Sequence, residues 1–174
     1  MGTASAATNP RGVSGNPKRI GTFYTNTQWV PRTVRAGSTI YIRTWYMERS
    51  KDTLVAQDFG LDLWNRATPI RGISVSWLNP LTHRWQASTD TDHHGYFALG
   101  LQKEPTLLAV APGRWAHIDV RITFSKSAYK GTWHIMPEPA SGYGLRNSAG
   151  TFDWAFLDSA SSSGWPQYTT NVRP

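Results

Sequence analysis

The feature that most constrains this chain is a strict two-residue alternation between residues 116 and 124. Apolar side chains occupy every second position there, and polar or charged side chains fill the positions between them. The apolar set is Ala116, Ile118, Val120, Ile122 and Phe124, and it alternates with His117, Asp119, Arg121 and Thr123. Because successive side chains of a β-strand point to opposite faces of a sheet, this pattern predicts a strand with one buried and one solvated face.

Several other segments also predict strands. Residues 38–47 are rich in β-branched and aromatic side chains and have apolar residues on both faces, which predicts a central strand. Alternation over residues 73–77, an Asn-Pro break, and renewed alternation over residues 83–87 predict a hairpin in which Trp77 lies across from Trp85. The remaining strand candidates are residues 61–64, 96–101, 132–136, 152–156 and 167–172.

Helical periodicity is weak throughout the sequence. The only helix candidates are residues 153–159 and 102–110, and Pro105 interrupts the second. Short strands separated by turns that contain Gly and Pro favour an all-β, immunoglobulin-like antiparallel sandwich over a barrel or an α/β fold. A length of 174 residues predicts one such domain, whose core is large enough to fold although the chain has no cysteine and therefore no disulfide.

Positive charge is concentrated at the N-terminal end of the chain. The first acidic residue is Glu48, whereas six basic residues precede it in a chain whose net charge is +7. The beginning of the chain is also polar and rich in Gly, Pro, Ser, Thr and Asn. We therefore predict a flexible basic arm over residues 1–20, followed by a sandwich domain over residues 21–174.

Three interpretations of this basic arm compete. Its charges can serve solubility alone, they can dock the segment onto a partner protein, or they can bind nucleic-acid phosphates. Nucleic acid is the least favoured of the three, because five basic residues over the first 35 positions would release few counterions. Under partner docking, the predicted contact residues are Arg11, Lys18, Arg19 and Trp29.

Three motifs resemble the immunoglobulin-like modules of secreted bacterial, particularly actinobacterial, proteins. Residues 72–80 match a Trp-bearing strand and hairpin, residues 95–99 a Gly-aromatic strand, and residues 111–115 a Pro-Gly corner that feeds a long alternating strand. The resemblance covers about residues 35–136, and the cysteine pair of antibody domains is missing. It implies an immunoglobulin-like fold and a surface or adhesive role, and it identifies no ligand and no site residue.

Nine Trp and seven Tyr are more aromatic rings than the core of such a sandwich needs. Exposed rings anchor protein interfaces or stack on the faces of sugars. A carbohydrate-binding module is therefore the first alternative function, with Trp85, Trp115 and Trp133 as the stacking residues. Core packing is the competing explanation for each of these rings taken alone.

No motif in the sequence predicts catalysis or a metal site. The segment that starts at Asp90 and Asp92 begins like a calcium loop, but Leu101 stands where such a loop needs a bidentate Glu. The two aspartates are thus weak metal candidates, and a polar connection between strands is the preferred interpretation. His117, Asp119 and Arg121 can share one surface, which a solvated set of ion pairs explains. We predict no enzymatic activity, no catalytic residue and no cofactor.

The N-terminus leaves two accounts of processing open. Ala4-Ser5-Ala6 has the spacing of a signal-peptidase site, so Met1-Gly2 either replaces a removed signal peptide or is a native start on a flexible tail. No apolar run approaches the roughly 20 residues that span a bilayer, so no membrane span is expected. The predicted function is a secreted, non-enzymatic interaction or adaptor module that binds another protein. A small viral coat protein is the second alternative, because a jelly roll has a similar strand content.

Overall fold

The computed structural model describes residues 19–49, 53–56, 59–67, 69–88, 94–99, 108–139, 143–146, 152–159 and 166–174. All regular secondary structure within these ranges is β-strand. Most of the predicted basic arm lies outside them, including Arg11 and Lys18, and so do Asp90 and Asp92. The proposed boundary between an arm and a domain therefore stays a prediction.

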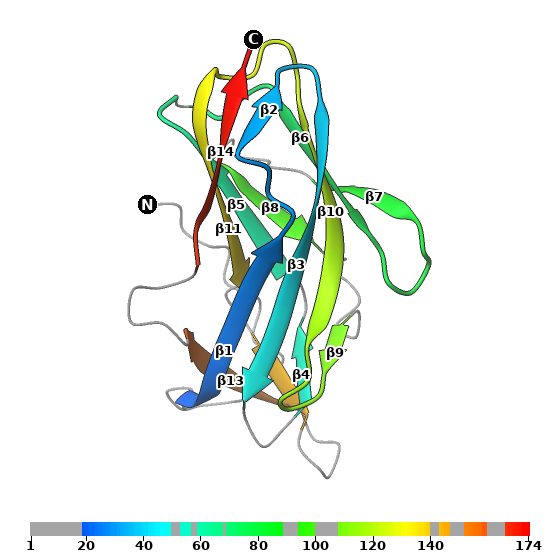
Figure 1. Cartoon of the computed structure of the whole chain (residues 1–174). Coiled ribbons are helices and arrows are strands. Elements are labelled where there is room, and N and C mark those ends of the chain that lie inside the picture. Colours follow the sequence, from blue (N-terminus) through cyan, green and yellow to red (C-terminus); the bar gives the residue numbers. More distant parts are fainter. Residues whose placement is uncertain are drawn as a thin grey trace.

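Fourteen strands in the described residues form two sheets that pack face to face (Figure 1). The strands of the larger sheet are β1 (Arg19–Gln28), β3 (Thr39–Arg49), β4 (Thr53–Ala56), β6 (Ile73–Leu78), β7 (Trp85–Ser88), β9 (Leu108–Val110), β10 (Ala116–Phe124), β12 (Tyr143–Arg146) and β13 (Phe152–Ser159). The smaller sheet contains β2 (Thr33–Arg35), β5 (Phe59–Trp64), β8 (Tyr96–Leu99), β11 (Gly131–Pro139) and β14 (Tyr168–Arg173). Their spatial orders are β7-β6-β10-β3-β1-β13-β12-β4-β9 and β2-β14-β11-β5-β8.

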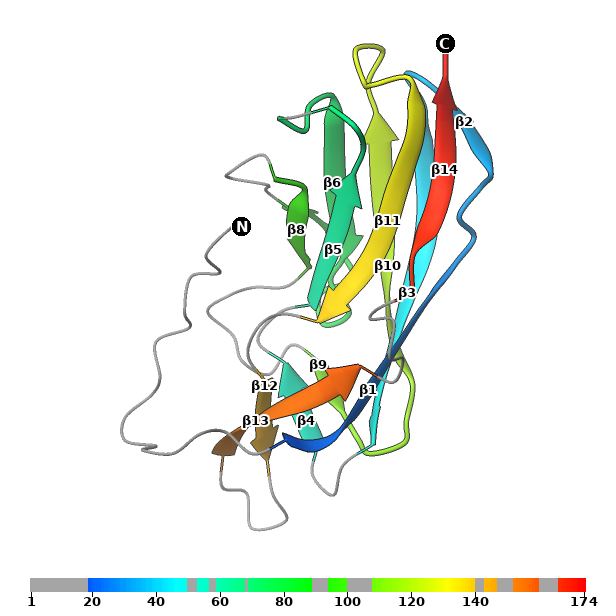
Figure 2. The same ribbon diagram turned by 90° about the vertical axis from the view of Figure 1, so that its left-hand side faces the viewer.

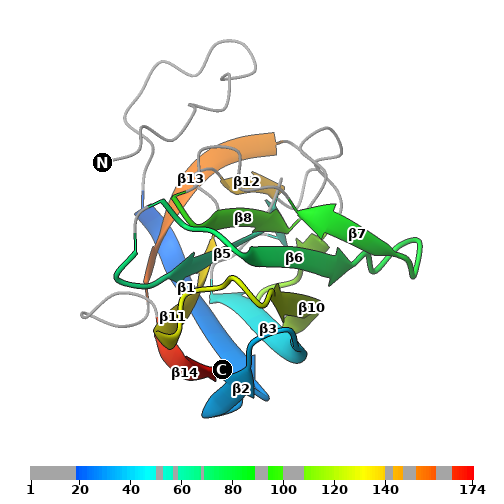
Figure 3. The same cartoon turned by 90° about the horizontal axis from the view of Figure 1, so that it is seen from above.

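The pairings between strands are antiparallel apart from β1 with β13 and β2 with β14. The chain leaves β1 in the larger sheet and enters β2 in the smaller sheet, where β2 lies beside the last strand (Figure 3). β4, β9, β12 and β13 gather at one end of the sandwich, opposite the end that carries the C-terminus (Figure 2). The predicted all-β, immunoglobulin-like antiparallel sandwich is confirmed, and β3 is central as expected, with β1 and β10 on its two sides.

The alternation that was predicted for residues 116–124 appears directly in the burial of β10. Ile118, Val120, Ile122 and Phe124 are each at most 1% exposed, and they face the second sheet. Burying a side chain of this size contributes about 1.5–3 kcal/mol relative to leaving it in water. The inward face of this one strand is therefore a main part of the hydrophobic core.

Trp133 belongs to the core, so its prediction as a glycan-stacking residue is wrong. Its side chain has no exposed surface, its Nε1 donates a hydrogen bond of 2.9 Å to the carbonyl of Tyr129, and its ring meets Phe124 edge to face. The physical reason is the parity of β11, in which Trp133 and Ile135 point inward while Thr132 and His134 point outward. The sequence alternation was visible, but the face that is buried depends on the opposite sheet.

The predicted hairpin forms between β6 and β7, but its predicted register is wrong by one residue. Leu78 pairs with Trp85, and Trp77 pairs with Gln86. The connection spans six residues, 79–84, and His83 within it adopts a left-handed φ of 53°. Because a shift of one residue moves a side chain to the other face, Trp77 is buried in the core while Trp85 faces solvent.

Neither helix candidate is a helix in the described residues. Residues 153–159 lie in β13 and residues 108–110 form β9, while residues 102–107 lie outside the description. Backbone pairing with β1, β12 and β4 outweighs the weak local preference of these segments. The described part of the chain contains no helix long and apolar enough to cross a membrane.

We expect Trp133→Ala to lower the free energy of unfolding by about 3–5 kcal/mol, because it removes a buried ring from a packed core. Trp85→Ala should lower it by clearly less than Trp133→Ala does, because Trp85 is 37% exposed and lies outside the core. Urea unfolding followed by circular dichroism measures both values. Equal losses in the two variants would contradict the assigned faces.

Candidate binding face

The outward face of the larger sheet carries an ordered array of aromatic and charged side chains. Cross-strand pairing aligns them in rows, since Arg43 lies opposite both Gln28 and Asp119, and Trp45 lies opposite His117. We call this array the aromatic–arginine face. Its members are Trp29, Tyr41, Arg43, Trp45, Trp85, His117, Asp119 and Arg121.

Arg43 and Asp119 form a bidentate ion pair across β3 and β10. Arg43 Nε lies 2.5 Å from Asp119 Oδ1, and Arg43 Nη2 lies 2.8 Å from Asp119 Oδ2. This hydrogen bonding holds the pKa of Asp119 below its usual value; partial desolvation opposes the effect, and the charges of Arg43 and His117 add to it. The sequence pattern grouped Asp119 with His117 and Arg121, which are its neighbours along β10, but its ion-pair partner comes from the adjacent strand.

Trp29 closes one side of this ion pair. The Arg43 guanidinium carbon lies 4.8 Å from the centre of the Trp29 ring and 5.7 Å from that of Trp45. Trp45 is held in turn, because its Nε1 donates a 3.0 Å hydrogen bond to Gln28 Oε1 and its ring contacts His117. Trp29 is 61% exposed and has a φ of 66°, a left-handed conformation that is strained for a bulky side chain.

Arg121 organises the other half of the face. Its guanidinium carbon lies 4.1 Å from the centre of the Trp85 ring, and its Nε donates a 3.0 Å hydrogen bond to Ser76 Oγ. Tyr41 is 59% exposed and meets Trp85 edge to face, with ring centres 6.2 Å apart. Sequence analysis did not single out Tyr41, although its outward position on a central strand and opposite Arg121 was the available signal.

The predicted contact residues fall in different places. Trp29 and Trp85, which were predicted for different ligands, lie on the same face. Trp115 is 48% exposed and immediately precedes β10, whereas Arg19 begins β1. Within the described residues, no three His, Cys, Asp or Glu side chains gather in a way that would hold a metal ion.

The inward side of β1 and β3 is unexpectedly polar toward the end opposite the C-terminus. Thr44, Tyr46 and Glu48 of β3 are fully buried, and Thr25 of β1 pairs with Tyr46. Burial raises the pKa of the Tyr46 phenol well above its ordinary value, and a hydrogen bond with Thr44 opposes this rise. The other half of the same strand contributes apolar residues such as Ile42 to the core.

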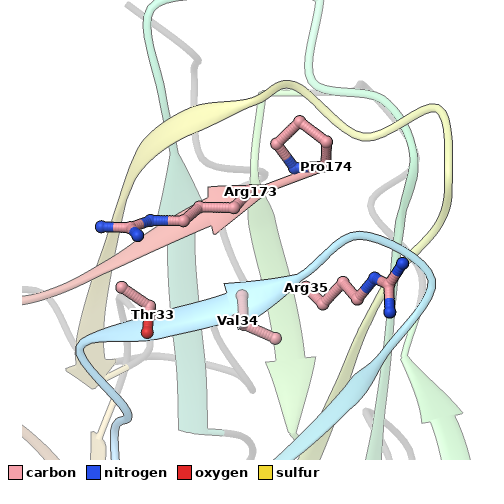
Figure 4. Close-up of a pocket in the computed structure, with 5 residues that line it drawn as sticks. All are labelled: Thr33, Val34, Arg35, Arg173 and Pro174. Carbon is pink, nitrogen blue, oxygen red and sulfur yellow. The ribbon is translucent and has the colours of Figure 1, made fainter.

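A shallow depression beside the C-terminus is a weaker candidate for a binding site. It is lined by Thr33, Val34, Arg35, Arg173 and Pro174 (Figure 4). The guanidinium groups of Arg35 and Arg173 point away from each other in this view. They do not converge on one anion, so we place the candidate site on the aromatic–arginine face.

Comparison with known proteins supports the fold alone. No protein-family model matches the chain, and no curated protein matches it by sequence. Among solved structures, the chain is similar to AvmM, described as catalysing macrocyclization in alchivemycin A biosynthesis, with a TM-score of 0.60, 13% identity, and coverage of 88% of this chain and 89% of that one.

Two cohesins resemble the chain more distantly. The seventh ScaB type I cohesin from Pseudobacteroides cellulosolvens has a TM-score of 0.43 and 7% identity, with 86% of this chain and 92% of that one covered. A type I cohesin–dockerin complex from Clostridium thermocellum has a TM-score of 0.46 and 10% identity, with 87% and 99% covered. At such identities, none of these structures transfers a function or a site to this chain.

The ion pair between Arg43 and Asp119 predicts a specific dependence of stability on pH. Because the pKa of Asp119 is lowered in the folded state, the pair stabilises the fold above the ordinary carboxyl pKa of 3.8 and this contribution is lost as pH falls through the lowered value. Asp119→Asn should cost up to about 1 kcal/mol near pH 7 and weaken the acid dependence. Urea unfolding across the acid range measures both effects, and superimposable pH profiles for the two proteins would contradict them.

The buried phenol of Tyr46 predicts the opposite dependence at alkaline pH. Its pKa is raised in the folded state, so its contribution is fully present below the ordinary value of 10.0 and is lost as pH rises above it. Tyr46→Phe should therefore lose less stability than the parent protein between about pH 10 and pH 12. Thermal melts measure the difference, and phenolate absorbance should show one late-titrating Tyr fewer. An identical alkaline loss would indicate that Tyr46 titrates normally.

Proposed function

We propose that this protein is a non-enzymatic, extracellular interaction module that binds a partner protein across the aromatic–arginine face. The observation that carries the proposal is the exposure of large rings on a sheet whose opposite side forms the core. Trp29 and Tyr41 are 61% and 59% exposed, and Trp85 is 37% exposed. Trp, Tyr and Arg are the residues most enriched among the energetic centres of protein interfaces.

The exposed rings are also restrained before any partner arrives. Arg43 and Arg121 lie against Trp29 and Trp85, and each arginine is anchored by a further hydrogen bond on its own sheet. Binding therefore costs little additional side-chain ordering. Exposed rings that are already held in place are more consistent with a binding surface than with incidental exposure.

The basic N-terminal segment extends this proposal. Arg11, Lys18 and Arg19 precede or begin β1, and β1 ends directly before Trp29. We propose that this segment contacts the same partner, with its charges steering the encounter. Non-enzymatic character and secretion from a bacterium of the actinobacterial type are parts of the proposal that rest on the sequence motifs.

The geometry of the rings favours a protein over a glycan. Tyr41 and Trp85 meet at an interplanar angle of 75°, so these two rings do not form a flat platform. The guanidinium of Arg121 also covers one face of Trp85. Sugar stacking needs accessible ring faces, so Trp85 is better suited as an interface anchor than as the glycan-stacking residue of the alternative prediction.

The double variant Trp29→Ala/Tyr41→Ala tests the proposed function. A partner is first captured on the immobilised full chain, identified and purified, and its Kd is then measured by calorimetry. We expect the double variant to weaken binding at least about a hundredfold, because each ring is an interface anchor. Omitting residues 1–18 should weaken binding less, since that segment only adds to the same interface.

Tyr129→Ala is the matched control, because Tyr129 is also an exposed Tyr but does not belong to the aromatic–arginine face. It should leave the Kd within about twofold of the parent value. Unchanged affinity in the double variant would refute the proposed interface. Binding of a polysaccharide panel by the parent chain, lost in Trp85→Ala, would instead support the glycan module.

A further inference from the structure

We infer that Arg121 recognises a carboxylate of an acidic segment in the partner protein. This inference rests on the proposed function and specifies the chemistry of the partner. Two arginines on neighbouring rows of the same face differ in their partners. Arg43 is engaged by both carboxylate oxygens of Asp119, whereas Arg121 forms no ion pair with any residue in the described part of the chain.

The Arg121 side chain is held in a geometry suited to a carboxylate. Its guanidinium lies over Trp85, and the hydrogen bond from its Nε to Ser76 Oγ fixes the orientation of the planar group. No hydrogen bond engages its two terminal nitrogens among the described residues, and together they can donate two parallel hydrogen bonds to one carboxylate. A guanidinium that is already ordered loses little side-chain entropy when it binds.

The surroundings of Arg121 match an acidic protein side chain. Asp119 is the carboxylate among the members of the aromatic–arginine face, and its charge is already compensated by Arg43. Arg121 therefore leaves a positive charge beside the rings of Tyr41 and Trp85. An Asp or Glu side chain flanked by apolar residues would satisfy both the charge and the rings.

Nucleic acid fits the same residues less well. Stacking of bases needs open aromatic faces, but Arg121 covers one face of Trp85, and Tyr41 approaches the ring edge on. Binding through phosphates also needs several uncompensated cations, whereas Arg43 is neutralised by Asp119. An acidic polypeptide is therefore the occupant to which this inference commits.

The test uses the full-length chain and a fluorescent glutamate-rich peptide that also contains Leu. Fluorescence anisotropy at physiological salt gives the Kd for the parent, Arg121→Gln, Arg121→Lys and Arg173→Gln. Arg173 is the matched control, because it is an exposed arginine of β14 in the other sheet. We expect Arg121→Gln to weaken binding about tenfold and Arg173→Gln by less than about twofold.

Arg121→Lys separates geometry from charge. It keeps the positive charge but loses the planar pair of donors, so we expect it to weaken binding at least about threefold. Equal losses in Arg121→Gln and Arg173→Gln would mean that net charge alone attracts the peptide, and they would overturn the inference. Thermal melts establish that each variant is folded at the temperature of the assay.

Two further binding measurements separate a failure of this inference from a failure of the proposed function. A single-stranded oligonucleotide should bind weakly and respond equally to Arg121→Gln and Arg173→Gln; tight binding lost only in Arg121→Gln would overturn the inference in favour of nucleic acid. With the purified partner, a loss in Trp29→Ala/Tyr41→Ala but none in Arg121→Gln would overturn this inference and leave the proposed function standing. No loss in either variant would overturn the proposed function itself.

Discussion

The antiparallel pairing of β3 with β10 is the constraint on which the rest of this structure depends. Its register places Val120 opposite Ile42 on the inward side and Asp119 opposite Arg43 on the outward side. The same backbone alignment therefore builds the hydrophobic core and the ion pair at the centre of the candidate site. A slip of one residue would put the apolar set in solvent and the charges in the core, and the cost of both changes keeps the register unique.

The neighbours of this pair extend both faces in the same way. β6 adds Trp77 to the core and Ser76 to the outward face, where Ser76 anchors Arg121. The protein thus orders its exposed aromatic rings with groups that are already held in place by sheet pairing. This explains how Trp29 and Tyr41 are held in place although each is more than half exposed.

Alternation and turn residues allowed the strands that carry the core to be predicted. β10, β3 and the hairpin of β6 and β7 were found in this way, because a period of two and an Asn-Pro break are local properties. Residues 152–156 and 153–159 were overlapping candidates for a strand and a helix, and the strand forms because it pairs with β1, which is distant in sequence. The prediction that Trp133 stacks on a glycan was wrong for a related reason. The alternation showed that β11 has two faces, but it did not show which face the opposite sheet would cover.

The sequence by itself determined that the chain would be all-β and that one side of residues 116–124 would be buried. It also determined that the chain has more aromatic rings than a core requires and that its N-terminal end is basic. Only the tertiary structure decided that Arg43 would meet Asp119, 76 positions away, and that Arg121 would lie over Trp85. The physical reason is that periodicity is a property of a single strand, whereas partner and register depend on long-range backbone pairing and on the packing of two sheets.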